Sequence, residues 1–539
     1  MAVKILSYAF SLTLVLTLLS LPVAAAEWIE IAPQGHYFQT ESGRPFIVIG
    51  HNDAITWPNL DDLLITSNPV ETDRYLAKLK ANGINTLRIM LEYAQESYGL
   101  LENPLGEFAP RVVAFWDRFI KLAETYDIHL IITPWDPFWM ERNWARNPYN
   151  RRNGGPMDSM KGFLTDPEAI AWQRRRLAFA IERWGGSPAI LAWELMNEIE
   201  LWWGATPQEI SQWITETAAF VRTREMELYG RTHLLTASLA TPFPSKALVD
   251  AVLNHPDLDF ATTHQYVGPA TNQPTNTVDA ALDVELATLY ARSQLTDKRP
   301  YLDTESGPID RWINDPAFDT EYYHNMSWAH LASGGAGQGL RWPYRNPHVL
   351  TEGMYRVQAA LARFVDAFDW KGFVPAPIAR YATVEATPSP AQDSAPASAS
   401  TLSIPDVRVF GVADKTRALL WLLNMTSRDA EQGRRTPASQ PLGTATGRPA
   451  LEGAFLIVDR KSWREQVWNG QFGQAKASQA YAAEAGPTAT ASETLTVQFW
   501  NTYTGEMIAE TRVVTAADTW TIPLPAFDRD LAIVIKMVE

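Results

Sequence analysis

The 539-residue sequence contains no cysteine. This absence excludes disulfide bonds, thiolate metal sites, a cysteine nucleophile and a lipid-modified cysteine anchor. The sequence also lacks the His-Glu-x-x-His pattern of zinc hydrolases, the Gly-x-Ser-x-Gly turn of serine hydrolases and a phosphate-binding loop. We therefore expect no metal and no organic cofactor, and the chemistry must depend on other side chains.

Basic residues are too few to balance the acidic ones. The chain has 46 Lys and Arg against 61 Asp and Glu, which gives a net charge of -15. Because phosphate groups are bound by basic surfaces, nucleic acid and anionic membranes are disfavoured as partners, and a neutral or cationic partner fits better. The hydrophobic share of 46% is typical of a globular chain, and its length favours about two domains.

The amino terminus has the pattern of an export signal. Lys4 supplies the positive charge, residues 5–21 form an apolar stretch, and Pro22 to Ala26 form a small-residue cleavage site. We expect cleavage after residues 1–26 and a secreted protein that does not contact the membrane afterwards. The alternative is a retained anchor helix, because the apolar stretch approaches the length that spans a bilayer.

Residues 27–372 alternate between strand-like runs and helical patterns. The runs of strand type are 46–51, 84–90, 128–133, 190–198, 232–238, 258–265, 299–304 and 337–342. Each is followed by a helical pattern, at 71–82, 111–126, 167–184, 207–229, 246–253, 279–292, 320–332 and 354–368. This alternation predicts an α/β fold, a (β/α)8 TIM barrel. A doubly wound sheet is the competitor, but its glycine-rich turn after the first strand is missing.

Beyond residue 372 the pattern changes to short strands. The runs 380–384, 407–410, 418–423, 495–500, 519–524 and 531–535 predict a smaller C-terminal all-β sandwich domain over 373–539. Two stretches rich in small and polar residues, near 387–400 and 427–448, predict disordered surface insertions. A linker between domains at 387–400 is the alternative.

The apolar fourth run ends in the polar pair Asn197-Glu198. A carboxylate at the end of a buried strand is costly unless it is paired or used in chemistry. Strand alternation places Glu194 and Glu198 on one face, with Glu198 nearest the strand's carboxyl end. We therefore predict Glu198 as a catalytic acid, Glu194 as a structural hydrogen-bonding group and Glu200 as a loop carboxylate.

A second carboxylate is expected at the same end of the barrel, where the active sites of this fold lie. The seventh strand ends in Asp303-Thr304-Glu305. Asp303 lies one pleat deeper on the same face, so Glu305 is preferred. Strands four and seven face each other across a barrel of this size, and two carboxylates about 5–5.5 Å apart are what retaining glycoside hydrolysis needs.

The segment Arg183 to Glu198, reading RWGGSPAILAWELMNE, resembles the fourth-strand motif of family 5 glycoside hydrolases, their endo-β-mannanase members in particular. The order and spacing of the motifs are similar over residues 30–370. The resemblance implies Glu198 as the general acid/base and Glu305 as the nucleophile. The loop Pro134 to Trp139 lacks a histidine that many relatives carry. Asp303-Thr304, directly before Glu305, also differs from the usual cellulase or mannanase motif.

The resemblance implies supporting roles for five further residues. Asn197 would hold the sugar's 2-hydroxyl, and Tyr266 would donate a hydrogen bond to the nucleophile. Arg88 would orient that nucleophile and keep it ionised. His264 would lie close to the acid/base, and Trp342 would form the floor under the attacked sugar.

Aromatic residues are frequent on the loops after the first, third and fourth strands. They are Trp57, Trp135, Phe138, Trp139, Trp144, Trp202 and Trp203. We expect half of them to pack in the core and the others, Trp135 included, to stack on sugar rings, which present apolar faces. Asn52, after the first strand, is expected to hydrogen-bond a sugar.

Together these features predict a secreted, monomeric, retaining hydrolase of a β-linked mannan- or glucan-like polysaccharide or oligosaccharide. Glu198 must carry a proton while Glu305 is ionised, and we expect the charge of Glu305 to help raise the pKa of Glu198. The alternative is a non-catalytic carbohydrate-binding protein on the same barrel.

Overall fold

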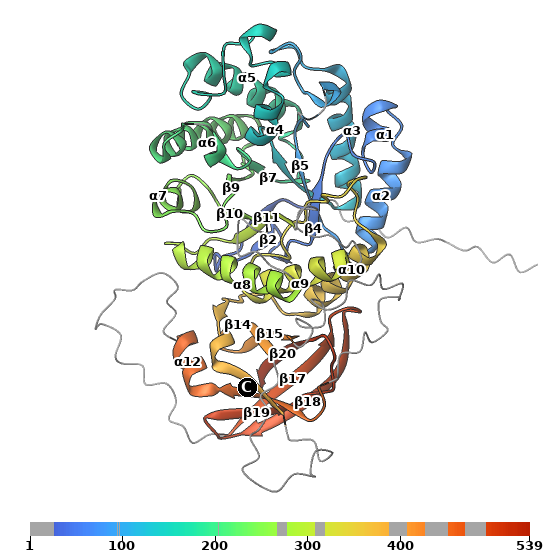
Figure 1. Cartoon of the computed structure of the whole chain (residues 1–539), viewed down its shortest axis with the longest axis vertical. Coiled ribbons are helices and arrows are strands. Elements are labelled where there is room, and N and C mark those ends of the chain that lie inside the picture. Colours follow the sequence, from blue (N-terminus) through green and yellow to red (C-terminus); the bar gives the residue numbers. More distant parts are fainter. Residues whose placement is uncertain are drawn as a thin grey trace, which may run out of the picture.

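The computed structural model describes residues 26–93, 95, 97–202, 204–266, 277–307, 318–386, 407–425, 451–468 and 492–538. These residues form two parts, a barrel of strands surrounded by helices and a smaller β-domain packed below it (Figure 1). The predicted signal segment, apart from Ala26, and both predicted insertions lie outside the described residues.

Parallel strands form the centre of the upper part. One run contains β4 (Gly50–Asp53), β5 (Thr86–Met90), β6 (His129–Thr133), β7 (Ile190–Glu194) and β8 (Leu234–Thr236). A second run contains β9 (Ser238–Leu239), β10 (Ala261–Tyr266) and β11 (Tyr301–Gly307). Only Ala237 separates β8 from β9, so the predicted strand 232–238 belongs to both runs. Every residue of β5, β6 and β7 is buried, as expected for strands covered on both faces.

The eighth position of the barrel is filled by residues 336–342. The backbone N–H of Ser306 donates to Leu340 at 2.8 Å, and that of Asn52 donates to Arg341 at 2.8 Å. These bonds join β11 to β4 and close the ring, which confirms the predicted barrel, although the eighth strand pairs only through isolated bridges. The predicted first strand, 46–51, was wrong in its bounds, because Phe46 pairs in a separate hairpin and β4 continues to Asp53.

Helices surround the strands on the outside (Figure 1). They are α1 (Asp61–Ile65), α2 (Val70–Ala81), α3 (Pro110–Tyr126), α4 (Pro137–Arg142), α5 (Pro167–Trp184), α6 (Pro207–Tyr229), α7 (Lys246–Leu248), α8 (Thr277–Gln294), α9 (Asp319–Ala332) and α10 (Glu352–Ala367). All eight predicted helices are present, with α7 continuing as a wider turn through 249–253. Two short helices, α1 and α4, were not predicted and lie in the loops after β4 and β6.

Local sequence signals set the ends of the longest helices. The Thr206 side chain accepts from the backbone of Glu209, whose carboxylate accepts from the backbone of Thr206, so α6 begins with a capping box and Pro207. It ends at Gly230, which has a φ of 68° that favours glycine. Asp166 caps α5 by accepting from two backbone N–H groups of the first turn.

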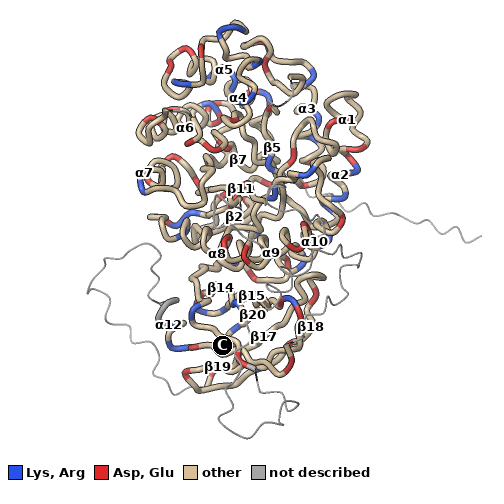
Figure 2. Tube along the Cα trace, viewed as in Figure 1, with Lys and Arg blue, Asp and Glu red and all other residues tan. Residues whose placement is uncertain are grey.

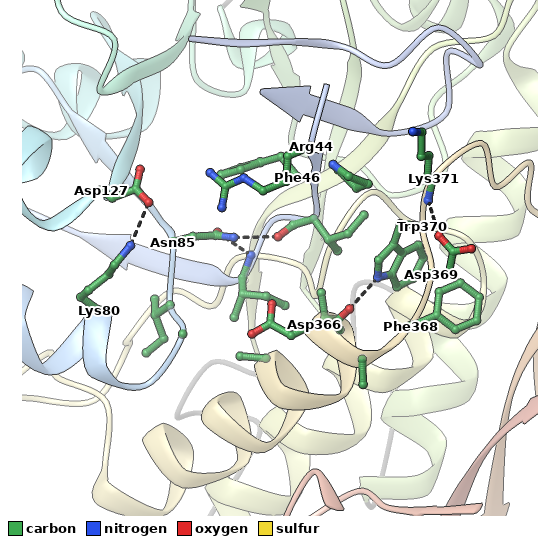
Figure 3. Close-up of a pocket in the computed structure, with 18 residues that line it drawn as sticks. Arg44, Phe46, Lys80, Asn85, Asp127, Asp366, Phe368, Asp369, Trp370 and Lys371 are labelled. Atoms are coloured by element: carbon green, nitrogen blue, oxygen red, sulfur yellow. Dashed lines mark hydrogen bonds and ion pairs between the residues drawn. The ribbon is translucent and has the colours of Figure 1, made fainter. Parts of the chain in front are cut away.

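A hairpin that the sequence did not reveal covers the amino end of the barrel. It consists of β1 (Ile29–Ile31), β2 (Phe38–Thr40) and β3 (Pro45–Phe46). A cavity of about 700 Å³ lies beside it, where Arg44 of the hairpin, Lys80 at the end of α2 and Asp366 of α10 meet (Figure 3). Its lining comes from residues that precede β4, β5 and β6, so it lies at the opposite end from the strands' carboxyl termini.

The β-domain contains two sheets. The larger has the order β12 (Ala376–Pro377), β14 (Val407–Ala413), β15 (Arg417–Asn424), β20 (Asp530–Val538), β17 (Glu493–Asn501) and β18 (Glu506–Thr515). The smaller has the order β13 (Ala382–Ala386), β16 (Ala454–Asp459) and β19 (Thr519–Pro523). A shared apolar core lies between them, as in a sandwich. The prediction of an all-β domain was wrong in one respect, because helix α12 (Arg460–Trp468) follows β16 directly.

The barrel and the β-domain share one hydrophobic core. Trp421 of β15 stacks on Trp328 of α9 with ring centroids 6.3 Å apart, and both indoles are buried. His324 of α9 lies 2.6 Å from the carboxylate of Asp530 across the same interface. Helices α9 and α10 therefore pack on the strands of the barrel and on the larger sheet of the β-domain.

Charged residues of both signs are spread over the outer helices and strands (Figure 2). Within the described ranges, no helix combines the length and the apolar composition that crossing a membrane requires.

We predict that Trp421→Ala destabilises the protein by about 3–5 kcal/mol, because it leaves a cavity in the shared core. Denaturant unfolding followed by tryptophan fluorescence and circular dichroism measures this loss. Val514→Ala is the control, since Val514 is 67% exposed on β18 and should change stability by less than about 0.5 kcal/mol. An unchanged midpoint for Trp421→Ala would contradict the shared core.

Candidate active site

The strands' carboxyl ends bring the predicted residues together. Arg88 lies on β5, His264 and Tyr266 on β10, Glu305 on β11, and Glu198 in the turn that follows β7. Hydrogen bonds join Glu305 to Arg88 and Tyr266, and Glu198 to His264, and the two groups lie side by side in the buried site. The cluster therefore lies at the carboxyl ends of the strands, where barrels of this kind have their active sites.

Arg88 is the centre of the cluster. Its guanidinium donates to both oxygens of Glu194, at 2.6 and 2.8 Å, and to Glu305 Oε2 at 2.7 Å. It also donates to Asn52 Oδ1 at 2.9 Å and to Asn197 Oδ1 at 2.6 Å. These bonds use all of the five N–H groups that arginine has, so the buried side chain is fully satisfied and fixed.

Glu305 is held through both of its oxygens. Arg88 donates to Oε2, and the Tyr266 hydroxyl donates to Oε1. Both oxygens are thereby held in place by one cation and one hydroxyl. Glu305 also keeps 7% of its surface exposed, so the group can still be approached from the cleft.

Glu198 reaches the site by a turn. β7 ends at Glu194, and Glu198 has a φ of 43°, a left-handed conformation that is strained for any residue except glycine. Its backbone N–H donates to the Ser238 hydroxyl at 2.9 Å, which fixes this conformation. The alternation argument therefore selected the right end of the segment, but the turn and not the strand aims the carboxylate.

Glu198 is suited to carry a proton. Burial raises its pKa to about 7, the Arg88 charge opposes that rise, and the charge of Glu194 adds to it. Glu305, whose charge was expected to help raise this pKa, is not among the causes of the shift. His264 Nδ1 lies 2.8 Å from Glu198 Oε1, and burial lowers the pKa of His264 to about 4, so the imidazole is neutral.

The two carboxylates face each other at short range. One oxygen of Glu198, one oxygen of Glu305 and a ring nitrogen of His264 all lie within 4.8 Å of one another. Such a trio resembles a metal-ligand set, but Glu305 is already bonded at both oxygens and the Arg88 cation is its direct neighbour. The donor set therefore fits a proton-transfer pair better than a cation site.

Three other carboxyl groups lie near the site, and their contacts differ from those of Glu198 and Glu305. Glu194 pairs with Arg88 through both oxygens and is part of the scaffold, as predicted. Asp303 is fully buried, burial raises its pKa well above its ordinary value, and its Oδ1 accepts from the backbone of Glu305 at 3.2 Å. Burial and the charge of Glu198 raise the pKa of Glu200 to about 7, and Glu200 Oε1 accepts from the Thr241 backbone.

Two predicted sugar contacts are corrected. Both amide hydrogens of Asn52 are donated to the backbone oxygens of Thr304 and Leu340, at 3.0 and 2.9 Å, and its oxygen accepts from Arg88. Asn52 therefore closes the barrel and positions Arg88. Trp135 is 1% exposed and packs edge-on against other core rings, so it offers no stacking face to a sugar.

The aromatic residues of the loops divide into a buried and a partly exposed group. Trp57 and Trp202 are buried like Trp135, whereas Phe138, Trp139 and Trp144 remain partly exposed. Trp203 lies outside the described residues. Trp342 is half-buried at the end of the eighth segment, with its ring edge-on to Trp57 at 4.8 Å, which is compatible with a floor for a sugar.

Two residues of the site were missed from the sequence. Asp136, after β6, accepts from the Asn197 amide at 2.9 Å, and Ser238, at the start of β9, supports the turn of Glu198. The rule that catalytic groups follow the strands could have indicated both, since each directly follows an apolar run. Nothing in the linear sequence showed which partners they meet.

A parallel barrel with two facing carboxyl groups at the carboxyl ends of its strands is typical of the (β/α)8 glycosidases. The chain belongs to glycosyl hydrolase family 5, because the model of that family, described as Cellulase (glycosyl hydrolase family 5), matches residues 41–317.

Similar proteins include two plant enzymes. Mannan endo-1,4-beta-mannosidase 1 of Solanum lycopersicum is 25% identical over 255 residues, which cover 42% of this chain and 60% of the relative. Mannan endo-1,4-beta-mannosidase 2 of Oryza sativa subsp. japonica is 25% identical over 338 residues, covering 56% and 73%. The chain thus spans less than two thirds of the tomato enzyme.

A solved structure of similar fold is a glycoside hydrolase family 5 protein from Bacteroides vulgatus. It has a TM-score of 0.54 and 12% identity, and the match covers 94% of this chain and 93% of the other. At that identity the likeness shows the fold alone. It extends over the barrel and the β-domain together.

We predict that Arg88→Lys lowers kcat at least about 100-fold with a smaller change in KM, because a lysine cannot make the forked contacts that hold Glu305 and Asn197. Steady-state kinetics on a glycoside substrate measures the change. Arg183→Lys is the matched control, since Arg183 makes a bidentate pair with Asp117 on the outer surface. Equal kinetics for Arg88→Lys and wild type would contradict the central role of Arg88.

Proposed function

We propose that this protein is a secreted, retaining β-glycoside hydrolase in which Glu198 is the general acid/base and Glu305 the nucleophile. The distance of at most 4.8 Å between an oxygen of each carboxylate carries the proposal. Retaining enzymes have carboxyl groups about 5–5.5 Å apart, whereas inverting enzymes leave room for a water at about 6.5–9.5 Å.

In the first step Glu305 attacks the anomeric carbon while Glu198 gives its proton to the leaving glycosidic oxygen. The glycosidic bond breaks and a covalent glycosyl-enzyme forms. In the second step Glu198 removes a proton from water, whose oxygen attacks the same carbon and releases Glu305. Arg88 and Tyr266 stabilise the carboxylate before the first step and after the second.

The proposed substrate is a β-linked mannan, with a β-glucan as the second choice. The similarity to the two plant mannan endo-1,4-beta-mannosidases supports this order. The partly exposed Trp139, Trp144 and Trp342 supply apolar ring faces along which a neutral polysaccharide could bind. The export-type amino terminus supports a secreted location.

We expect Glu305→Ala to lose at least about 10⁴-fold of the activity on β-mannan, because no other described side chain can replace the nucleophile. Release of reducing sugar from β-mannan, β-glucan and xylan measures the loss. Glu200→Gln is the matched control, because Glu200 is a neighbouring carboxylate outside the reacting pair and its variant should keep most of the activity.

Two outcomes would count against the proposal. Wild type that binds these glycans but releases no sugar from any of them would favour a carbohydrate-binding protein instead. Nuclear magnetic resonance of the first product formed from an aryl β-glycoside tests the stereochemistry, and an initial α-anomer would contradict retention.

The pH dependence follows from the raised pKa of Glu198. The acid must be protonated to act, and it loses its proton as the pH rises through about 7. We therefore expect kcat/KM to fall above about pH 7. Glu198→Ala should lose this basic limb on an aryl glycoside with a good leaving group, and added azide should restore turnover by forming a β-glycosyl azide. A basic limb that is unchanged in this variant would exclude Glu198 as its origin.

A further inference from the structure

Asp136 has a buried carboxylate oxygen without a hydrogen-bond partner in the described part of the chain. The residue follows β6 and is 6% exposed. Its Oδ1 accepts from the Asn197 amide at 2.9 Å and from the backbone of Phe138 at 3.1 Å, which caps α4. Its Oδ2 is buried and has no hydrogen-bond partner among the described residues. Since buried polar atoms are normally bonded, Oδ2 is available for a ligand.

The structural contacts of Asp136 are all made by its other oxygen, Oδ1. Oδ1 both caps the helix and fixes the orientation of the Asn197 amide, whose own oxygen accepts from Arg88. Oδ2 contributes to neither contact.

The contacts run in a fixed order through the site. Glu305 is bonded to Arg88, Arg88 to Asn197, and Asn197 to Asp136. These four side chains form one wall of the site at the strands' carboxyl ends, in which Asp136 and Glu305 keep 6% and 7% of their surface exposed. Under the proposed function Glu305 attacks the anomeric carbon. Asn197 keeps one amide hydrogen for the hydroxyl on carbon 2, the next atom of the ring.

We propose that Asp136 Oδ2 binds the 3-hydroxyl of the sugar that Glu305 attacks. Along the wall, Glu305 is followed by Asn197 and then by Asp136. Along the sugar ring, the anomeric carbon is followed by carbon 2 and then by carbon 3, so the two orders match. The inference rests on the proposed function and adds a specificity-determining residue to it. Position 136 belongs to the loop Pro134 to Trp139, in which this sequence differs from the motif that many of its relatives have.

The contact works in both protonation states of Asp136. Burial raises its pKa to about 7, the Asn197 hydrogen bond opposes the rise, and the charges of Glu198 and Glu305 increase it. Arg88 is the positively charged residue in the same wall, and Asn197 lies between it and Asp136. A hydroxyl can donate to the ionised carboxylate and accept from the protonated one, so the 3-hydroxyl is bound on either side of neutral pH.

The contact also restricts the linkage. A sugar that is substituted at oxygen 3 has no hydroxyl to donate, and it would place a bulky group against a buried carboxyl. A β-1,3-linked backbone is therefore excluded from this position, whereas a β-1,4-linked backbone leaves the 3-hydroxyl free.

A cycle of enzyme and substrate variants tests the proposal. The substrates are the aryl β-mannoside, or the aryl β-glycoside of whichever sugar the wild type hydrolyses, together with its 3-deoxy and 6-deoxy forms. The enzymes are wild type, Asp136→Ala, Asp136→Asn and Asp166→Ala, the last a helix-cap control on α5. Circular dichroism and thermal unfolding verify that each variant is folded.

We expect loss of the 3-hydroxyl to lower kcat/KM of the wild type and of Asp166→Ala about 10- to 100-fold. In Asp136→Ala the parent substrate should already show that loss, and removal of the 3-hydroxyl should cost little more. Asp136→Asn keeps the cap and presents an amide to the sugar, so part of the dependence should return. Removal of the 6-hydroxyl should have the same effect in every enzyme.

An undiminished 3-deoxy effect in Asp136→Ala would overturn the proposal. If Asp136→Ala does not fold, Asp136→Asn decides it, because an effect equal to that of the wild type across its pH profile would also contradict a contact with the carboxyl. In both cases wild-type hydrolysis of the parent glycoside would leave the proposed function intact. That function fails separately, if the wild type hydrolyses none of the glycosides or polysaccharides.

Discussion

The buried guanidinium of Arg88 is the interaction on which the site depends. An unpaired charge inside a barrel would cost several kcal/mol, so its surroundings must supply acceptors for every N–H group. Glu194, Glu305, Asn52 and Asn197 supply them from β7, β11, β4 and the turn after β7. One side chain therefore connects the closing seam of the barrel to the groups that face the cleft, and fixes their relative positions.

The two facing carboxyl groups differ because only one of them is hydrogen-bonded to Arg88. Glu305 accepts from Arg88 and from Tyr266. Glu198 lies beside a neutral imidazole, that of His264, and burial raises its pKa to about 7. A carboxyl group paired with a cation and a carboxyl group of raised pKa thus lie within 4.8 Å of each other. This division of roles follows from the hydrogen bonds that each group receives.

The predictions from the sequence succeeded where a local pattern was sufficient. Apolar runs and helical periodicity located the barrel elements, and the polar ends of the runs pointed to Glu198 and Glu305. They failed where a side chain's partner decided its role. Both amide hydrogens of Asn52 bind backbone oxygens, Trp135 is enclosed by other rings, and α12 lies in a domain that was predicted to contain strands alone. Asp136 was passed over because its neighbour Asn197 is about 60 residues away along the chain.

By itself the sequence determined the alternation of strands and helices and the polar residues that follow the apolar runs, and therefore which residues stand at the carboxyl end of the barrel. These are consequences of hydrophobic periodicity, which is local. The tertiary structure alone decided that Arg88 satisfies four side chains, that Glu198 turns into the cleft through a left-handed backbone, and that Asp136 retains a free oxygen. Such features depend on contacts between residues far apart in the chain, and no local pattern encodes the distance or the direction of those contacts.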